Sequence, residues 1–232
     1  MDTVLIEKKH PLQGKIVRNI NRPSKDVISR IKKLYSGIIL DHLGKFGSMI
    51  KDIKPVSSGM KLCGPAVTVY GPDLTVRRMA IDLAEPGDVL VVGAHGIEDY
   101  ACFGDGTARR MQVKGLEGAI IDGSTRDSAG IRSLGFPTFI KNCTPRNYHY
   151  PVSAEYGAIN IPIACGGVIV NPGDIIFGDD DGVIVVPKDI SIEMIECMER
   201  ALVEERRIRN TWKEYEPFNV EEELKKRGYS FV

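Results

Sequence analysis

Apolar residues recur at helical spacing in three parts of the chain. After a polar beginning, Ser24 offers an N-cap and Gly44 a stop for one predicted helix. Its apolar positions are Val27, Ile28, Ile31, Leu34, Tyr35, Ile38, Ile39 and Leu43. A long helix is predicted after Asp189, the expected N-cap of a stripe comprising Ile190, Met194, Ile195, Met198 and Leu202. A short last helix is expected because Asn219 and Glu222 fit a capping box, with Gly228 as its stop.

Between these helices, β-rich and helical patterns alternate with short links. The strands are expected over residues 60–70, 89–93, 118–122 and 137–141, and the helices over 74–84, 104–114 and 128–134. Such alternation predicts βαβ units around a largely parallel sheet, hence an α/β fold. After residue 151, glycine- and proline-punctuated strands at 168–170, 175–177 and 183–186 indicate a meander or barrel-like extension of the same core.

The chain length supports one domain with appendages. With 232 residues, 43% of them hydrophobic, the chain can bury a sizeable core. We expect an N-terminal arm over residues 1–23, the α/β domain over 24–213, and a tail with a short helix over 214–232.

Charge and cysteine usage narrow the function classes. Thirty-one basic residues balance 31 acidic ones, which leaves no excess positive field to favour nucleic acid or anionic lipid. No apolar run approaches a membrane span or a signal peptide, and the five cysteines lack the spacing of a structural zinc site. We therefore expect a cytoplasmic protein with reduced thiols.

Ligands of open α/β sheets bind beyond the carboxyl ends of the strands, so the loops after strands are the first candidates. In residues 122–127, Arg126 and Asp127 stand side by side where a strand gives way to a helix. Arginine suits a carboxylate or an oxyanion, and aspartate suits a hard cation such as Mg²⁺. The competing interpretation is an aspartate that caps the helix beside an arginine in a salt bridge, a common arrangement.

The loop over residues 93–107 is the second candidate. Its glycines near a helix start suit a carboxylate cradle of backbone N–H groups, although neither a Walker A nor a Rossmann spacing is present. Asp105 would gain a role as an outer metal ligand if the two loops meet.

Other candidates are weaker. Residues 178–182 resemble a cation loop but lack the distal glutamate of an EF-hand, so a β-turn is expected. His42, His95 and His149 form no catalytic grouping in sequence, and Lys141 at a strand end is more often solvated than a Schiff-base lysine.

An ordered series of motifs resembles one family. It comprises Ser36-Gly37-Ile38, Asp41-His42-Leu43-Gly44, Ile53-Lys54-Pro55, the run from Gly59 to Val69, Ala84-Glu85-Pro86-Gly87-Asp88, Phe103-Gly104, the run from Asp122 to Asp127, Gly135-Phe136-Pro137, Pro172-Gly173-Asp174 and the run from Asp181 to Pro187. Across residues 27–210 the chain resembles the 4-hydroxy-4-methyl-2-oxoglutarate / 4-carboxy-4-hydroxy-2-oxoadipate aldolases and the related regulators of ribonuclease activity A.

The resemblance implies an αββα sandwich like the swivelling phosphohistidine domain, with a central mixed sheet. It also implies a homotrimer or homohexamer with sites between subunits. In such aldolases the residue matching Asp127 holds a divalent metal, Mg²⁺ or Mn²⁺. The arginine matching Arg126 contacts the pyruvate oxygen that becomes an enolate, and amides matching Gly104, Asp105, Gly106 and Thr107 receive the pyruvate carboxylate.

The implied activity is cleavage of 4-hydroxy-2-oxo dicarboxylic acids to pyruvate, with oxaloacetate decarboxylation through the same enolate. A neighbouring subunit is expected to add an acidic residue, matched by Glu204 or Glu205. Gly106 and Thr107 are smaller than the family's leucines, which leaves the substrate's size open. Two alternatives remain: a non-catalytic protein that binds a ribonuclease, and a metal-dependent lyase for another hydroxy or sugar acid.

Overall fold

The computed structural model describes residue 12 and residues 14–94, 98–147 and 157–231. Within this part, nine strands form one mixed sheet in the order β1-β6-β5-β3-β2-β10-β11, with β4 beside β5 and β7 beside β2. Parallel pairing joins β2, β3, β5 and β6, whereas β10, β11 and β1 pair antiparallel. The strands are β1 (Lys54–Pro55), β2 (Leu62–Tyr70), β3 (Val89–Gly93), β4 (Ala101–Phe103), β5 (Gly118–Thr125), β6 (Thr138–Cys143), β7 (Ala158–Ile159), β10 (Ile175–Asp179) and β11 (Gly182–Val186).

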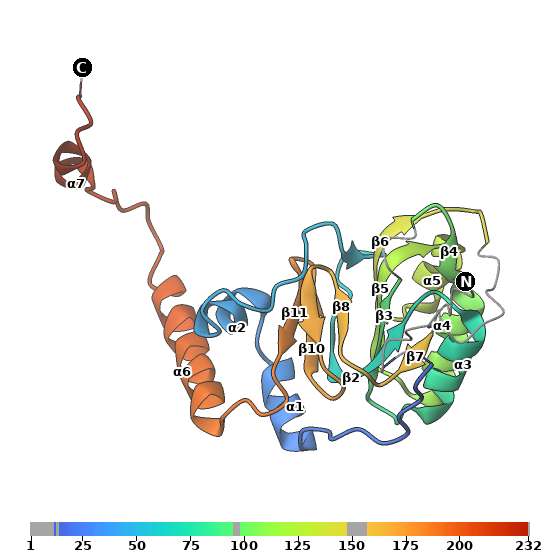
Figure 1. Cartoon of the computed structure of the whole chain (residues 1–232). Coiled ribbons are helices and arrows are strands. Elements are labelled where there is room, and N and C mark those ends of the chain that lie inside the picture. Colours follow the sequence, from blue (N-terminus) through green and yellow to red (C-terminus); the bar gives the residue numbers. More distant parts are fainter. Residues whose placement is uncertain (1–11, 13, 95–97, 148–156, 232) are drawn as a thin grey trace, which may run out of the picture.

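A two-stranded sheet of β8 (Ile163–Cys165) and β9 (Val168–Val170) packs near β3 and β2. The helices are α1 (Lys25–Lys32), α2 (Ser36–His42), α3 (Leu74–Leu83), α4 (Asp105–Lys114), α5 (Ser128–Leu134), α6 (Ile192–Arg209) and α7 (Glu221–Lys226). In Figure 1, α3, α4 and α5 cover one end of the strand layers, and α1, α2 and α6 cover the other.

Alternating side chains divide the core into three layers. In β3, Leu90 and Val92 pack toward α3, α4 and α5, while Val89 and Val91 pack into a cluster between the strand layers. In β11, Val185 joins that middle cluster and Val186 packs against α1, α2 and α6. This period-two alternation produces helix, strand, strand and helix layers, which confirms the αββα sandwich.

One predicted helix is wrong in its extent. The apolar stripe between Ser24 and Gly44 belongs to two helices, because Tyr35 adopts an extended conformation between them. Ser36 then starts α2, and its N–H donates to the carboxylate of Asp179 over 2.9 Å. A side chain 143 positions away caps this helix, and local periodicity carries no trace of such a contact.

The predicted caps of the last two helices are also wrong. Ser191, rather than Asp189, caps α6, where its hydroxyl accepts from Met194 N–H over 3.2 Å. Asn219 takes a left-handed conformation one residue before the cap of α7, and no side chain caps that helix. Both helices nevertheless occupy their expected parts of the chain.

Strand β4 was missed, and β5 continues beyond residue 122 to Thr125. These two strands pair in parallel, with Ala101 opposite Ser124 and Phe103 opposite Thr125. The pairing brings the ends of both candidate loops together. No helix among the described residues is long and apolar enough to cross a membrane.

Candidate functional site

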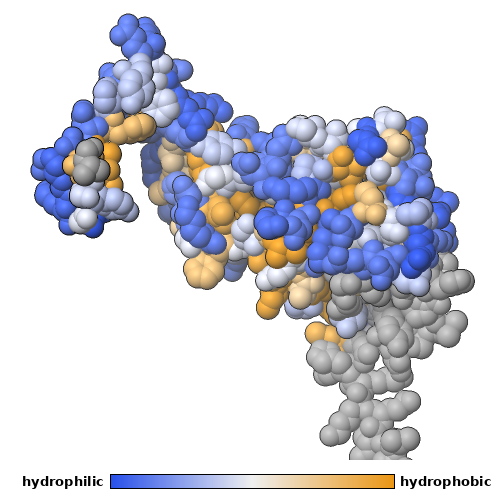
Figure 2. All heavy atoms as spheres, turned by 90° about the horizontal axis from the view of Figure 1, so that it is seen from above, coloured by the Kyte–Doolittle hydropathy of each residue, from blue (hydrophilic) through white to orange (hydrophobic). Residues whose placement is uncertain are grey.

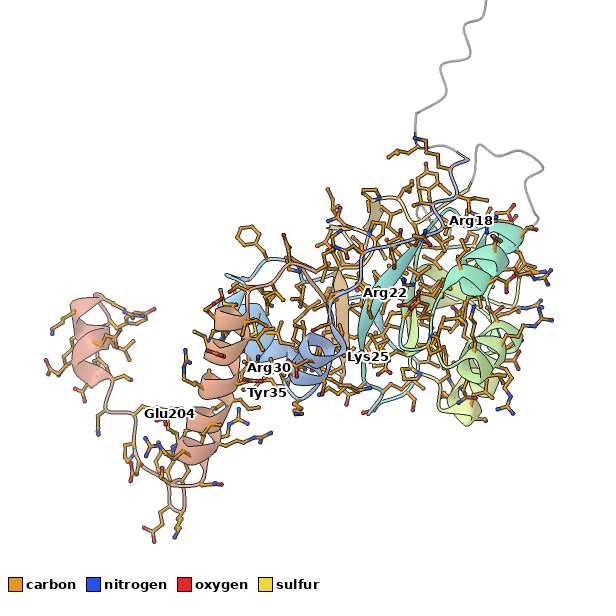
Figure 3. The ribbon with its side chains drawn as sticks, turned by 90° about the horizontal axis from the view of Figure 1, so that it is seen from below. Arg18, Arg22, Lys25, Arg30, Tyr35 and Glu204 are labelled. Carbon is orange, nitrogen blue, oxygen red and sulfur yellow. The ribbon has the colours of Figure 1, made fainter. Side chains whose placement is uncertain are left out.

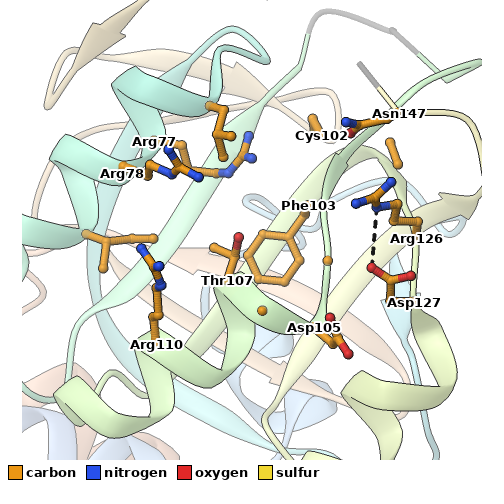
Figure 4. Close-up of a pocket in the computed structure, with 15 residues that line it drawn as sticks. Arg77, Arg78, Cys102, Phe103, Asp105, Thr107, Arg110, Arg126, Asp127 and Asn147 are labelled. Atoms are coloured by element: carbon orange, nitrogen blue, oxygen red, sulfur yellow. Dashed lines mark ion pairs between the residues drawn. The ribbon is translucent and has the colours of Figure 1, made fainter. Parts of the chain in front are cut away.

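The two candidate loops meet where β4 and β5 give way to α4 and α5. The N–H of Arg126 donates to the carbonyl of Phe103 over 3.0 Å, which fixes the start of one loop against the other. A cavity of about 280 Å³ opens there (Figure 4). Its lining is Leu74, Arg77, Arg78, Ile81, Ala101, Cys102, Phe103, Gly104, Asp105, Gly106, Thr107, Arg110, Arg126, Asp127 and Asn147.

Asp127 occupies the N-cap position of α5, but its side chain makes no capping hydrogen bond. Its backbone is left-handed, with a φ of 59°, a conformation that costs an aspartate about 1 kcal/mol or more. The carboxylate lies beside the guanidinium of Arg126, with Oδ2 3.3 Å from Nε, and both side chains remain almost half exposed. The competing interpretation expected a salt bridge between Arg126 and Asp127 and a helix cap made by Asp127. The salt bridge is present, but the cap is absent, and the Asp127 carboxylate faces the pocket.

Two glycines make room for the two carboxylates of the site. A Cβ on Gly104 would lie 3.0 Å from Oδ2 of Asp127, and a Cβ on Gly130 would lie 2.9 Å from Cβ of Asp105. Asp105 and Asp127 consequently lie on the same side of the pocket, as Figure 4 shows. The structure thus brings together the two aspartates that sequence reasoning had placed on separate loops.

The start of α4 supplies backbone N–H groups. Gly104 is its N-cap and offers no capping side chain, so the N–H groups of Asp105 and Gly106 have no partner within the helix. The N–H of Thr107 already donates to the carbonyl of Gly104 over 3.1 Å. Of the N–H groups expected to bind a carboxylate, those of Asp105 and Gly106 therefore remain free of helix hydrogen bonds. Both lie at the positive end of the α4 dipole.

Sequence reasoning missed the arginines opposite the aspartates. Arg77 and Arg78 come from α3 and Arg110 comes from α4, and Figure 4 shows them across the pocket from Arg126. Arg77 is only 3% exposed and donates to the carbonyl of Pro72 over 3.2 Å. Its position between Leu74 and Ile81, three residues after one and four before the other, puts a charge on an apolar helix face. That spacing was the available signal.

The pocket donors fit a single hard cation. No group of three or more metal-binding side chains occurs among the described residues. Mg²⁺, however, usually retains several waters and takes only one or two protein carboxylates. The carboxylate of Asp127 is exposed and makes no capping hydrogen bond, and Asp105 lines the same pocket. These two carboxylates match that donor set.

The weaker candidates take structural roles. Lys141 pairs with Glu98, and this hydrogen bond raises the pKa of Lys141, which disfavours a neutral amine nucleophile. His42 bonds through Nδ1 with the carbonyl of Ile38. Asp180 and Asp181 form the expected turn between β10 and β11, and residues 178, 179 and 182 belong to the paired strands. His95 and His149 lie outside the described residues.

Glu204 and Glu205 lie on α6, at the end of the molecule remote from the pocket (Figures 1 and 3). Glu204 pairs with Arg207, and Glu205 pairs with Arg209 and accepts from the hydroxyl of Tyr35. Within one chain neither residue reaches Asp127. A role in the site would require a second subunit.

Comparisons with known proteins identify the family of this chain. A protein of Halalkalibacterium halodurans named "Putative 4-hydroxy-4-methyl-2-oxoglutarate aldolase" is 36% identical over 166 residues, covering 70% of this chain and 77% of that protein. The crystal structure of Streptomyces coelicolor RraAS2, described as an unusual member of the RNase ES inhibitor RraA protein family, is 32% identical. It has a TM-score of 0.70 and covers 81% of this chain and 100% of that one.

The RNA-processing inhibitor RraA of Thermus thermophilis shares the fold at 24% identity, with a TM-score of 0.60 over 68% of this chain and 95% of that one. The family model described as "RraA-like: Aldolase/RraA" matches residues 37–185, which include every pocket residue. The chain belongs to this RraA-like family.

Proposed function

We propose that the protein is a divalent-metal-dependent lyase that cleaves 4-hydroxy-2-oxo dicarboxylic acids and releases pyruvate. The observation that supports this most is the state of Asp127. Its carboxylate makes no capping hydrogen bond and faces the pocket beside Arg126, and its backbone is left-handed. Local strain at a carboxylate that performs no structural task is typical of functional sites.

The pocket's own groups suit a 2-oxo acid. The N–H groups of Asp105 and Gly106 would receive the carboxylate next to the oxo group, as helix starts do for anions. Arg126 would donate to the oxo oxygen, which gains negative charge when the C3–C4 bond breaks. A Mg²⁺ or Mn²⁺ ion bound by Asp127, with Asp105 in its outer shell, would supply Lewis-acid stabilisation of that charge.

The bond changes can be written in full. A base removes the proton of the 4-hydroxyl group, the C4–O bond becomes a carbonyl, and the C3–C4 electron pair moves to C3 and the oxo oxygen. A proton then adds to C3 and completes pyruvate. Oxaloacetate loses CO₂ through the same enolate, so we propose decarboxylation as a second activity.

The arginines across the pocket indicate which substrates fit. Arg78 and Arg110 are exposed and form no ion pair with the described residues, and both line the cavity with Arg77. Guanidinium groups bind carboxylates with two parallel hydrogen bonds. A substrate with a second carboxylate beyond C4 would use this wall, and the open space at Gly106 admits a substituent there.

The test measures pyruvate release from 4-hydroxy-4-methyl-2-oxoglutarate and from oxaloacetate, with Mg²⁺, with Mn²⁺ and with a chelator. We expect release that requires a metal ion, and a large loss in Arg126→Ala. The matched control is Arg132→Ala, an exposed arginine on α5 outside the pocket.

The similarity to RraAS2 supports a second candidate, a non-catalytic partner of a ribonuclease. Absence of pyruvate release from a folded, metal-loaded protein would favour that candidate or a lyase for another hydroxy or sugar acid. We also propose that the protein is a homotrimer or homohexamer whose sites lie between subunits, with Glu204 or Glu205 as the acidic contribution of a neighbour.

A further inference from the structure

Asn147 lines the pocket and has no part in the reaction described so far. Its backbone forms a parallel bridge with Ala101 of β4, and the N–H of Ala101 donates to the carbonyl of Arg146 over 2.7 Å. The guanidinium of Arg146 lies over the ring of Tyr100, 5.4 Å from its centroid. These contacts fix the segment after β6 against β4, and Asn147 thereby becomes part of the pocket wall.

The side-chain amide of Asn147 is available to a ligand. In Figure 4 it points into the pocket on the side of Arg126. The residue is exposed, and among the described residues its amide has no hydrogen-bond partner. Figure 1 places α7 at the opposite side of the molecule from β4, and Figure 2 shows that helix apart from the rest of the surface. The described end of the chain therefore leaves this wall of the pocket open.

The order of groups along the pocket matches the order of atoms in the proposed substrate. Asp127, Arg126 and Asn147 follow one another along one side of the pocket in Figure 4. A 2-oxo acid whose carboxylate binds at the start of α4 and whose oxo group meets Arg126 would extend its C4 atom toward Asn147. Guanidinium groups only donate hydrogen bonds and carboxylates only accept them, whereas an asparagine amide does both. Asn147 can therefore bind a neutral hydroxyl group at C4.

We propose that Asn147 determines specificity for 4-hydroxy substrates by donating a hydrogen bond from Nδ2 to the oxygen on C4. This inference rests on the proposed cleavage reaction. The amide takes no proton, because the base removes the hydroxyl proton and the C3–C4 electron pair moves to the enolate. The N–H group stays in place while the C4 oxygen passes from hydroxyl to carbonyl. Negative charge that develops on this oxygen strengthens the hydrogen bond, which favours cleavage.

The same N–H group should not favour decarboxylation. Oxaloacetate carries a carboxylate at C4, and this group loses its negative charge as CO₂ leaves. A donor at that position binds the substrate more strongly than the transition state, and such binding does not accelerate the reaction. The two reactions share the pyruvate enolate but change the charge on the C4 oxygen in opposite directions. Asn147 should therefore distinguish them.

The experiment compares kcat/KM for 4-hydroxy-4-methyl-2-oxoglutarate with kcat/KM for oxaloacetate. Asn147→Ala and Asn147→Asp should each lower this ratio about tenfold or more, because a hydrogen bond to a charged group is lost. Asn147→Asp keeps the size of the side chain but replaces the donor with an acceptor. Arg146→Ala is the control for the position of the loop. It removes the contact with the ring of Tyr100, keeps the amide and should preserve the ratio.

Hydrogen exchange at the methyl group of pyruvate, followed by NMR in D₂O, provides a second comparison. Pyruvate forms the same enolate but has no C4, so cleavage should also fall about tenfold or more relative to exchange in Asn147→Ala. Thermal unfolding of each variant checks its fold.

The outcomes separate this inference from the proposed function. An unchanged ratio in Asn147→Ala, or equal losses in cleavage, decarboxylation and exchange, would overturn the role of Asn147 and leave the lyase activity standing. Absence of pyruvate release from both substrates in the natural protein would instead overturn the proposed function, and this inference with it. A lower ratio in Arg146→Ala that matches the Asn147 variants would show that the loop position, rather than the amide, determines specificity.

Discussion

Gly104 and Asp127 face each other at the base of the pocket, where a Cβ on Gly104 would lie 3.0 Å from Oδ2 of Asp127. The same Cβ would lie 3.6 Å from Cγ of Arg126. The backbone of Gly104 is extended, with a φ of −166°, so a side chain there causes no backbone strain. The absence of a side chain at Gly104 therefore leaves room for the carboxylate of Asp127.

We predict that Gly104→Ala lowers kcat/KM about tenfold or more, because small misplacements at a reacting centre are costly. Val113→Ala is the control, since Val113 is an exposed residue of α4 that does not line the pocket. Steady-state pyruvate release and thermal unfolding compare the two variants. Equal activity of both alanine variants would contradict the role assigned to the contact between residues 104 and 127.

Asp127 allows a separation of stability from function. Its φ of 59° suits glycine better than aspartate, and its side chain makes no capping bond that a substitution would break. Asp127→Gly should therefore raise the free energy of unfolding by about 1 kcal/mol while it abolishes pyruvate release. Denaturant titration measures the first effect. A clear loss of stability would mean that the carboxylate supports the fold after all.

The described end of the N-terminal arm is tied to the core by Arg22. Its guanidinium donates to both oxygens of Asp88 over 2.9 and 2.8 Å, and the Asp88 side chain is only 1% exposed. This bond raises the pKa of Arg22. Arg22→Ala would leave the buried carboxylate of Asp88 with the N–H of Glu85 but without its charged partner, so we predict a loss of about 3 kcal/mol in the free energy of unfolding.

Arg18→Ala provides the comparison for Arg22→Ala. Arg18 is exposed on the same segment (Figure 3), and its truncation should change the unfolding free energy by less than about 0.5 kcal/mol. Chemical denaturation at neutral pH measures both variants. Similar small effects for the two arginines would contradict a structural role for the Arg22–Asp88 pair.

The thiols should differ sharply in reactivity. Burial, aided by the negative charge of Glu117, raises the pKa of Cys63 to about 12, and burial also raises the pKa of Cys102 and Cys165. Cys143 is exposed. At pH 8 a disulfide reagent should label Cys143 rapidly in the native protein, and Cys143→Ser should remove that fast phase.

The same shift in Cys63 sets a pH dependence of stability. Its thiol ionises near pH 8.5 in the unfolded chain but stays protonated in the native state up to pH of about 12. The native state then binds more protons, so the unfolding free energy should fall between these values by up to about 1.4 kcal/mol per pH unit. Cys63→Ala should flatten this alkaline decline, and an unchanged slope would contradict the assignment.

Local patterns predicted the layers of the fold well. The apolar run of β3 is buried as predicted, and so are Ile195, Met198 and Leu202 of the stripe on α6, because period two and period 3.6 are properties of the sequence itself. Met194 of the same predicted stripe is exposed. The break between α1 and α2 was not predictable in this way. It depends on the contact of Ser36 with Asp179, which exists only once the chain is folded.

The candidate site was likewise only partly predictable from the sequence. Arg126, Asp127 and residues 104–107 could be selected because they follow strands and precede helices. Strand β4 is only three residues long, too short for a clear pattern, and its pairing with β5 is what brings the two loops together. Arg78 and Arg110 resemble ordinary solvated helix residues in sequence, and only the packing of α3 beside α4 places them around one cavity.

If Asp127 holds the metal on which pyruvate release depends, a metal titration of the natural protein and of Asp127→Asn should separate the two proteins clearly. Asparagine keeps the size of the side chain and tolerates the left-handed backbone, so the fold should survive. We predict saturable activation by Mg²⁺ or Mn²⁺ in the natural protein and little or no activation in the variant at the same metal concentrations. Equal activation of a folded Asp127→Asn protein, or full activity of the natural protein in a chelator, would contradict a metal-binding role for Asp127.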